Sequence, residues 1–571
     1  MSEALRLYGT EVPDVASERI ICGDLSLSLQ DGALRHIRLG GQELIRSIAF
    51  LVRDRDWGTL VPELTEVSRE TAAGLRLHLR AVYRTDTARM DVDLRVTASD
   101  NRLRITAEGR VRGVFETNRA GFTVLHPASA AGAPVTVTHS DGTVARAAMP
   151  VLIDPWQPFL DITRLTHRAG AWDVTCAFEG DTFEMEDQRQ WGDASFKTYN
   201  RPLALPWPYV LEDGTVLRQA VEVSWDPAES RFDPIPADPV AGAVFPQMAL
   251  VVTAEEARQL GEDPSPLSWV APHRLLCSVD GASGNTAQQF AAFAALQRAA
   301  PSPHYDLELI PIFDAPPALD LARLALEMAQ AGFAPESVLV CPSVDRQSTP
   351  PGSDWPDCPP LEDIHAAAQD CFVGVEHGGG MVSFFPELNR KRPPVEQLDF
   401  VSHGLCPIVH AADDLSVMET LETIPHITRS ARAILGTARY RIGPSTIAMR
   451  QNPYGSRTMS NPGQGRVCMT DDDPRHRGAF GAAYVIGLAA ALAPAGVAVW
   501  TPAAVLGPRG IDPAWPICAA LNVLARLAGQ RVKAASVAGG LARLEVGGTI
   551  LTANLTARPN AGLAPYAWSE T

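Results

Sequence analysis

The sequence predicts a multidomain α/β plus β protein, with an N-terminal antiparallel β-sandwich, a central TIM (β/α)8-like barrel and a C-terminal β region. Three patterns along the 571 residues predict this order. Residues 1–245 carry short alternating runs, residues 246–530 alternate apolar strands with helical segments, and residues 531–571 return to strand-like alternation. A chain of this length is also too long for one hydrophobic core.

The first 245 residues are predicted to form many strands at hairpin spacing. The run ARMDVDLRV, residues 88–96, places its apolar side chains on one side, as a half-buried strand requires. Turn dipeptides such as Asp31-Gly32, Asp141-Gly142 and Asp213-Gly214 separate runs of this kind. This combination is typical of a large antiparallel sandwich.

A proline-rich connector, residues 234–246, precedes the change of period. Near-continuous apolar runs then alternate with helical segments, the first of which is expected over residues 286–298. Such runs predict parallel strands that are buried on both faces. About seven strand candidates approach the eight of a barrel. A doubly wound sheet is the alternative, but no glycine-rich phosphate loop opens a helix after the first strand.

The last part of the chain follows a predicted helix over residues 516–529. The runs GLARLEVGG and TILTANLTA alternate apolar and polar residues, and Gly547-Gly548 between them is a hairpin signal. We therefore expect a small β domain, or strands that complete a sandwich, over residues 531–571.

Composition argues against several classes of partner. The formal net charge of −17 disfavours nucleic acid and anionic membranes, which attract basic surfaces. The first twenty residues lack a secretory signal pattern, and Pro494 and Gly496 interrupt the most apolar stretch, residues 479–500, so no membrane span is expected. Nine dispersed cysteines without a CxxC pair fit free thiols in a reducing compartment, the cytoplasm. No cofactor and no metal are expected.

The segment FEMEDQRQWGDASFKTY, residues 183–199, carries charge on both faces when it is read as a strand. Charged side chains beside a large core must be paired, solvated in a cleft, or used in function. The segment is therefore either a structural salt-bridge network or the polar wall of a pocket. In the second case the candidate substrate-binding side chains are Glu184, Glu186, Asp187, Arg189 and Lys197.

In a βα barrel, functional side chains cluster at the C-terminal ends of the strands. The polar residues predicted at those ends are Asp280, Asp314, Asp345, Glu376, His377, His403, His410, Asp413 and Arg450. Any one of them can instead be a helix cap or the start of a loop, so the set together indicates a catalytic face. Arg450 is a candidate for substrate binding.

Three glycines, residues 378–380, come before a group of polar residues. Glycine lets the backbone approach a ligand or turn tightly. Glu387 can act as general base or acid, and Asn389 and Arg390 can bind hydroxyls or stabilise an oxyanion. A simple ion pair between Glu387 and Arg390 is the structural alternative.

His410 and Asp413 are predicted to end a strand, with Glu419 on the helix that follows. A histidine beside a carboxylate can act as a base near neutral pH, which makes His410 and Asp413 catalytic candidates and Glu419 a binding candidate. The alternative is a buried histidine with a purely structural role, whose hydrogen-bonding groups are paired with the neighbouring carboxylate. A continuous strand would place His403 and His410 on opposite faces, which disfavours a metal site.

Stretches along most of the chain resemble the D-apionate lactonase family of carbohydrate-catabolic enzymes. These stretches are RDRDWGT (53–59), NRAGFTVLHP (118–127), FEMEDQRQWGDASFKTY (183–199), GGGMVSFFPELNRKRPP (378–394), PIVHAADDLSVMETLE (407–422) and ILTANLTARP (550–559). The resemblance implies an architecture like that of clan-A glycoside hydrolases. It also implies hydrolysis of D-apionolactone to D-apionate in apiose catabolism.

One position departs from that family's pattern. Its members carry a Tyr-Glu-Thr-Thr-Gly motif late in the barrel, where this sequence reads WTPAAVLGPRGI (500–511). Ala504 takes the place of the glutamate. If that glutamate is catalytic or binds substrate in the family, the departure implies a different substrate, a different mechanism or weak activity for this chain.

The favoured hypothesis is a hydrolase that opens a small sugar-derived lactone. Glu387 or His410 would activate water, and Asn389, Arg390 or Arg450 would stabilise the tetrahedral oxyanion. The alternatives are a glycoside hydrolase that uses two barrel carboxylates and a non-catalytic carbohydrate-binding relative. No GxSxG elbow is present, so a serine α/β-hydrolase mechanism is not indicated.

Overall fold

The computed structural model describes residues 2–55, 57–72, 74–236, 239–455 and 457–571. Residue 56 of the RDRDWGT stretch and residues 237–238 of the predicted connector lie outside this description. The chain divides into two compact units. The barrel unit comprises Met1–Asp14, Gln190–Asp193 and Ala237–Thr571, and the sandwich unit comprises Val15–Arg189 and Ala194–Pro236.

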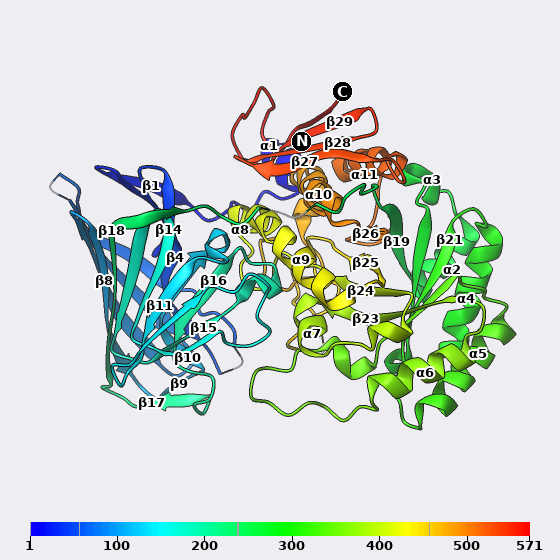
Figure 1. Ribbon diagram of the computed structural model, residues 1–571, viewed down its shortest axis with the longest axis horizontal. Coiled ribbons are helices and arrows are strands. Elements are labelled where there is room, and N and C mark those ends of the chain that lie inside the picture. Colours follow the sequence, from blue (N-terminus) through cyan, green and yellow to red (C-terminus); the bar gives the residue numbers. More distant parts are fainter. Residues whose placement is uncertain (1, 56, 73, 237–238, 456) are drawn as a thin grey trace. The chain divides into compact units, whose positions relative to one another are not determined.

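The sandwich unit contains two antiparallel sheets of eight strands each (Figure 1). The first sheet has the order β1 (Ser17–Cys22), β2 (Leu25–Gln30), β3 (Ala33–Leu39), β4 (Gln42–Arg53), β10 (Arg119–Pro127), β16 (Ser195–Asn200), β15 (Phe183–Glu186), β13 (Phe159–Ile162). The second has the order β12 (Val144–Ala148), β11 (Pro134–Thr138), β14 (Arg164–Glu179), β18 (Val216–Phe232), β8 (Arg102–Arg112), β7 (Arg89–Ser99), β6 (Leu75–Arg84), β5 (Glu63–Glu70). A short pair joins β17 (Tyr209–Leu211) to β9 (Phe115–Thr117).

Alternation along the strands builds the core of the sandwich. The run predicted at residues 88–96 forms β7, in which Met90, Val92 and Leu94 are buried while the intervening charged side chains face outward. Apolar residues of both sheets form one continuous cluster, as the two inner faces of a sandwich require. The predicted antiparallel sandwich is therefore confirmed.

The predicted barrel is also confirmed, and it closes with eight parallel strands. They are β19 (Gln247–Thr253), β20 (Arg274–Asp280), β21 (His304–Ile310), β22 (Ser337–Val340), β23 (Glu376–Phe384), β24 (Phe400–Gly404), β25 (Arg439–Pro444) and β26 (Val499–Ala504). Helices α2 (Ala254–Glu262), α3 (Leu267–Val270), α4 (Thr286–Ala299), α5 (Pro317–Ala331), α6 (Leu361–Cys371), α7 (Phe385–Arg390), α8 (Asp414–Glu419), α9 (Ile424–Leu435), α10 (Ala479–Leu492) and α11 (Pro516–Arg526) follow or flank them.

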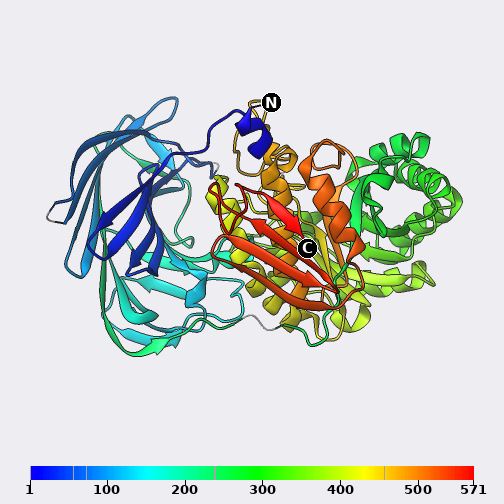
Figure 2. The same cartoon turned by 90° about the horizontal axis from the view of Figure 1, so that it is seen from above.

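The C-terminal β region is a four-stranded sheet of β27 (Val532–Ala538), β28 (Leu541–Val546), β29 (Thr549–Asn554) and β30 (Trp568–Glu570). It packs on α10, which also contacts α1 (Glu3–Tyr8) (Figure 2). Because α10 is apolar and buried around almost its whole circumference, it is a core helix. Among the described residues, no helix is long and apolar enough to cross a membrane.

Two predicted strands are wrong in extent. Residues 183–199 form a hairpin, in which β15 ends at Glu186 and a 3-10 turn over Gln188–Trp191 leads into β16. The strand expected to reach Asp413 ends at Gly404, and Pro407, which lacks a backbone donor, cannot continue a central strand. His410 and Asp413 therefore lie beyond the strand end, before α8.

A third prediction is wrong in position. The sequence predicts Glu376 and His377 at a strand end, but they are the first residues of β23. Glu376 there forms ion pairs with Arg439 and Arg441. Both partners lie on β25, so this acid belongs to the N-terminal end of the barrel, away from the end where catalytic groups gather.

Two of the three glycines of β23, Gly378 and Gly380, allow its neighbour β24 to pack closely. A Cβ atom on Gly378 would lie 2.1 Å from the ring of Phe400, and one on Gly380 would lie 2.2 Å from the carbonyl oxygen of Ser402. Gly380 also has a positive φ of 104°, which side chains rarely adopt. Backbone packing inside the barrel wall thus requires glycine at these positions.

Candidate active site

A four-residue segment, Gln190–Asp193, belongs by its contacts to the barrel unit although the flanking residues belong to the sandwich unit. It places Trp191 and Asp193 beside the loop that follows β24. Oδ2 of Asp193 lies 2.7 Å from Nδ1 of His410. The sequence marks His410 as a candidate, but it gives no reason to pair it with Asp193, which is only one of the charged residues of the segment 183–199.

The contact with Asp193 determines which ring nitrogen of His410 carries the proton. An ionised carboxylate only accepts hydrogen bonds, so Nδ1 of His410 is the donor and Nε2 of the neutral ring carries the lone pair. Nε2 lies 3.4 Å from the hydroxyl of Tyr454. The edge-to-face packing of Trp191 on the imidazole, at 5.8 Å between ring centres, restricts its rotation. The His410 side chain keeps 17% exposure, so water can reach the ring.

The second candidate, Glu387, lies in the first turn of α7 at the end of β23. It is 3% exposed, and Oε1 is 3.3 Å from Nη1 of Arg390. The same Nη1 donates to Oγ of Ser348 at 3.0 Å and to the carbonyl oxygen of Thr349 at 3.2 Å. Burial raises the pKa of Glu387, and the guanidinium of Arg390 opposes that rise. Glu387 and Arg390 thus form the ion pair that is the structural alternative to a catalytic role for Glu387.

Trp191 connects the two candidates. The guanidinium carbon of Arg390 lies 5.7 Å from the centre of the Trp191 ring, and Tyr454 packs against the same ring at 5.2 Å. Glu387 is thus linked through Arg390 and Trp191 to His410. The chain brings these groups together from four segments that are far apart in the sequence.

A further buried carboxylate lies at the same end of the barrel. Asp345 follows β22, is 3% exposed, and pairs through Oδ1 with Nζ of Lys391 at 2.6 Å. Its Oδ2 is buried and makes no hydrogen bond with any described residue. Burial raises the pKa of Asp345, and the Lys391 ammonium acts against this. The sequence marks Asp345 as a strand end, but its neighbours give no signal that selects it for function.

Arg450 lies beside the barrel interior. It forms an ion pair with Glu308 of β21 and donates to Oγ of Ser278 at 2.9 Å. The Glu308 carboxylate is 2% exposed, so the pair is a buried charged network. Ala504, the last residue of β26, is also buried and carries no group that could act as acid or base.

The remaining barrel candidates have structural contacts. Asp413 is the N-cap of α8, because its Oδ1 accepts from the backbone N–H of Ser416 at 3.0 Å. Glu419 is the last residue of α8, half-buried. Asn389 is buried in α7, where its carbonyl oxygen accepts from Nε of Arg392 at 3.4 Å. His403 binds the hydroxyl of Tyr440 and its own strand's backbone.

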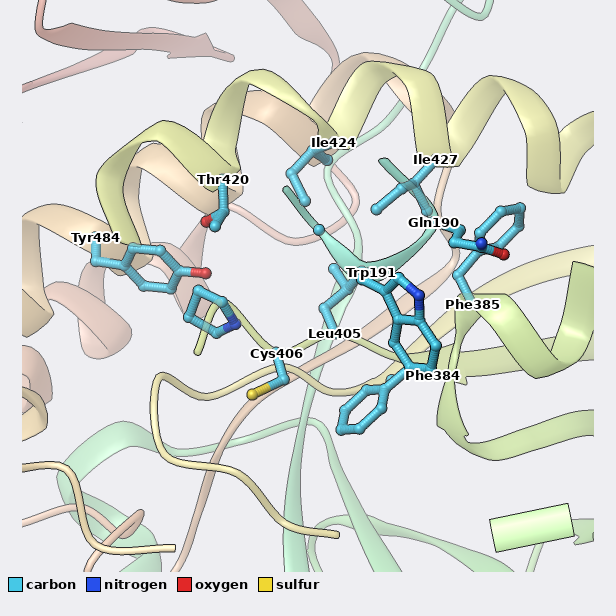
Figure 3. Close-up of a pocket in the computed structure, with 13 residues that line it drawn as sticks. Gln190, Trp191, Phe384, Phe385, Leu405, Cys406, Thr420, Ile424, Ile427 and Tyr484 are labelled. Atoms are coloured by element: carbon cyan, nitrogen blue, oxygen red, sulfur yellow. The ribbon is translucent and has the colours of Figure 1, made fainter. Parts of the chain in front are cut away.

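A small cavity lies behind Trp191, between the ends of β23 and β24 and helix α9 (Figure 3). Its volume is about 10 Å³, and its lining is apolar, including Phe384, Leu405 and Ile427. Such a volume holds at most one water, whereas ligand pockets measure roughly 300–1,000 Å³. The cavity is therefore a small gap in the side-chain packing around Gln190–Gly192, too small for a ligand. Among the described residues, no group of three His, Cys, Asp or Glu side chains could hold a metal.

The other sequence candidates lie in the sandwich unit. The hydroxyl of Tyr199 donates to Glu184 at 2.7 Å, and Lys197 pairs with Glu186 at 2.7 Å. Asp187 and Arg189 form a two-bond pair in which both side chains are fully buried. Arg189 also donates to the carbonyl oxygen of Pro150. This last pair has the geometry of a structural salt bridge.

Comparison with solved structures gives broad but weak likenesses. A GH36 α-galactosidase from Geobacillus stearothermophilus is 8% identical, with a TM-score of 0.28 over 94% of this chain and 91% of its own. A GH30 endoxylanase from Clostridium papyrosolvens is 8% identical, with a TM-score of 0.35 over 56% of this chain and 83% of its own. A putative aldose 1-epimerase from Escherichia coli is 11% identical, with a TM-score of 0.26 over 37% and 99%. TM-scores this low carry no information about function.

Sequence comparison is much more specific. Residues 248–544 match a family described as "D-apionate lactonase, TIM barrel domain", and residues 5–228 match "D-apionate lactonase, N-terminal domain". A protein of Brucella anthropi named D-apionate lactonase is 44% identical over 518 residues, which cover 88% of this chain and 85% of that relative. The chain belongs to the D-apionate lactonase family.

Proposed function

We propose that this protein opens a sugar-derived lactone by general-base hydrolysis, with D-apionolactone as substrate and D-apionate as product. Membership of the family makes it a lactone hydrolase, a class of carboxylic-ester hydrolase. The single observation that supports the mechanism is the 2.7 Å contact between Asp193 and His410. That contact orients the imidazole so that Nε2, which lies 3.4 Å from the Tyr454 hydroxyl, can act as the base.

In the proposed reaction, Nε2 of His410 takes a proton from water while the water oxygen bonds to the lactone carbonyl carbon. The carbonyl oxygen becomes an oxyanion. Collapse of this intermediate breaks the ring C–O bond, and the leaving alkoxide takes the proton back from the imidazolium. The open hydroxy acid then ionises, so each turnover releases one proton.

The neighbouring groups have supporting roles in this proposal. Asp193 holds the imidazole in the required tautomer and stabilises its protonated form. The Tyr454 hydroxyl, 3.4 Å from Nε2, can donate to the developing oxyanion. Arg390 holds Trp191 in place and offers positive charge, while Glu387 keeps Arg390 oriented. Asn389, Arg450 and Glu419 stay candidates for binding the sugar hydroxyls.

A glycoside hydrolase is the second candidate, and one observation favours it. Glu387 and Asp345 are two buried carboxylates at the same end of the barrel, and burial raises the pKa of both. Glycosidases use such a pair as acid and as base or nucleophile. A glycosidase would release reducing sugar, whereas a lactonase releases acid.

The deciding experiment follows acid release from D-apionolactone and from a panel of aldonolactones with a pH indicator. We expect H410Q to lower kcat by about 10²–10⁴-fold, the usual contribution of a positioned general base. H304Q is the matched control, since His304 lies at the start of β21 and is half exposed. Unchanged turnover in H410Q would overturn the assignment of the base, and no acid release from any lactone would overturn the activity.

A further inference from the structure

The outer face of the first sandwich sheet carries a cluster of charged and aromatic side chains. Strand parity places them there, because Phe122 of β10 and Phe196 of β16 point into the core and their neighbours point away. Register brings the outward residues side by side across the strands. Glu184 pairs with Tyr199, and Glu186 pairs with Lys197.

Arg119, on β10, is the unexplained member of this cluster. It is 7% exposed, and its Nε is buried without a hydrogen-bond partner in the described part of the chain. The guanidinium carbon lies 4.0 Å above the Tyr199 ring and 5.5 Å from the Trp57 ring. Among the described residues it forms no ion pair with a carboxylate. The charges of Glu186 and Glu184 act on the guanidinium through space, but neither carboxylate pairs with it directly, as a buried cation normally requires.

The two nearby carboxylates are used elsewhere. Oε1 of Glu184 accepts from the Tyr199 hydroxyl at 2.7 Å and from the backbone N–H of Leu203 at 2.8 Å. Oε2 of Glu186 lies 2.7 Å from Nζ of Lys197. These contacts fix both acids as local acceptors, and neither forms an ion pair with the Arg119 guanidinium.

Aromatic side chains border the same place. Trp57 and Trp207 pack edge to face, with their ring centres 5.3 Å apart, and Trp207 is 42% exposed. Flat aromatic faces next to fixed donors and acceptors suit a polyhydroxy ligand, whose C–H faces stack on rings while its hydroxyls bind the polar groups. A guanidinium without a directly paired carboxylate favours a ligand that carries negative charge.

We propose that this face of the sandwich unit is a binding site for a small sugar acid, whose carboxylate pairs with Arg119 and whose carbon chain contacts Trp57. The planar guanidinium can bind a carboxylate through two parallel hydrogen bonds. None of these residues is among those assigned to lactone opening, so the inference goes beyond the proposed function. The product of lactone opening has the required chemistry, so the site would sense or retain products of that class.

The test measures binding of sodium D-gluconate to the full-length protein by calorimetry and tryptophan fluorescence. We expect binding to the wild type, at least tenfold weaker binding to R119M, and an intermediate effect in R119K, which keeps the charge and loses the planar fork. Sorbitol, which lacks the carboxylate, should bind at least tenfold more weakly than gluconate. R218M, on an exposed position of β18, is the matched control.

Two further measurements separate this site from the barrel. H410Q should bind gluconate as the wild type does, whereas loss of binding in H410Q with retention in R119M would place the ligand in the barrel and overturn the proposal. Equal affinity of R119M and wild type, or no gluconate binding to the wild type, would also overturn it. Thermal unfolding shows whether R119M is folded, and gluconate should raise the Tm of the wild type but not that of R119M.

Discussion

Nδ1 of His410 lies 2.7 Å from Oδ2 of Asp193, although 217 residues separate them in the sequence. The sequence suggests Asp413 as the carboxylate partner because it is only three residues away. Asp413 instead accepts hydrogen bonds from the backbone and side chain of Ser416 at the start of α8. The two aspartates therefore have different expected roles.

The first prediction separates those roles. D193N should lower kcat by roughly 10²–10⁴-fold, because the amide no longer fixes the imidazole tautomer or stabilises its positive charge. D413A should chiefly lower stability, by about 1 kcal/mol, because it removes the side-chain oxygen that caps α8. Steady-state kinetics and thermal unfolding of both variants check this. A larger loss of kcat in D413A than in D193N would instead support Asp413, the partner that the sequence suggests.

The second prediction concerns the pH dependence of Glu387. Burial raises the pKa of this carboxyl and Arg390 lowers it, so removal of the cation in R390M should raise the pKa further. If ionised Glu387 is needed for turnover, the acidic limb of the kcat profile moves to higher pH in R390M. R392M is the matched control, because Arg392 lies two residues further along the chain and is exposed. If R390M and the wild type have the same pH profile, turnover does not depend on the ionisation of Glu387.

The third prediction concerns acid stability of the sandwich unit. His126 and His167 are buried in its interior with their ring centres 5.0 Å apart, and burial lowers the pKa of His167 to about 4. The unfolded chain, with a histidine pKa of about 6.5, therefore binds more protons below that pH. Stability should fall as pH drops from about 6.5 to about 4, by about 3 kcal/mol for His167.

The variant H167L tests this linkage, because neither ring nitrogen of His167 has a hydrogen-bond partner among the described residues. The variant removes one titrating group from the core. Its Tm should fall less between pH 7 and pH 4.5 than the Tm of the wild type. An equal fall in both proteins would show that the acid sensitivity arises elsewhere.

The fourth prediction concerns the glycines of the barrel wall. G380A should destabilise the protein by about 2–4 kcal/mol, because a positive φ and an overlap with the Ser402 carbonyl oxygen add together. Gly374 has a similar φ of 82°, but a Cβ atom added there would meet no described atom within 4 Å, so G374A isolates the cost of the backbone conformation. Unfolding in urea measures both. Equal destabilisation would mean that the barrel wall relaxes around the added methyl group.

The sequence by itself determined the architecture of this protein. Strand parity at residues 88–96, the helix near residues 286–298 and the return to strands after residue 531 all depend on neighbours two to four positions apart, so local periodicity predicts them. The resemblance to the D-apionate lactonase family is also present in the residues. The boundaries at residues 245 and 530 stay predictions.

Only the tertiary structure decided which polar residues meet. Asp193 reaches His410 through the short segment that packs with the barrel unit, and Arg119 forms no ion pair because Glu184 and Glu186 bind other donors. Contacts of this kind depend on segments far apart in the chain. Sequence periodicity reports the face on which a side chain lies, and it carries no information about the distant group that faces it.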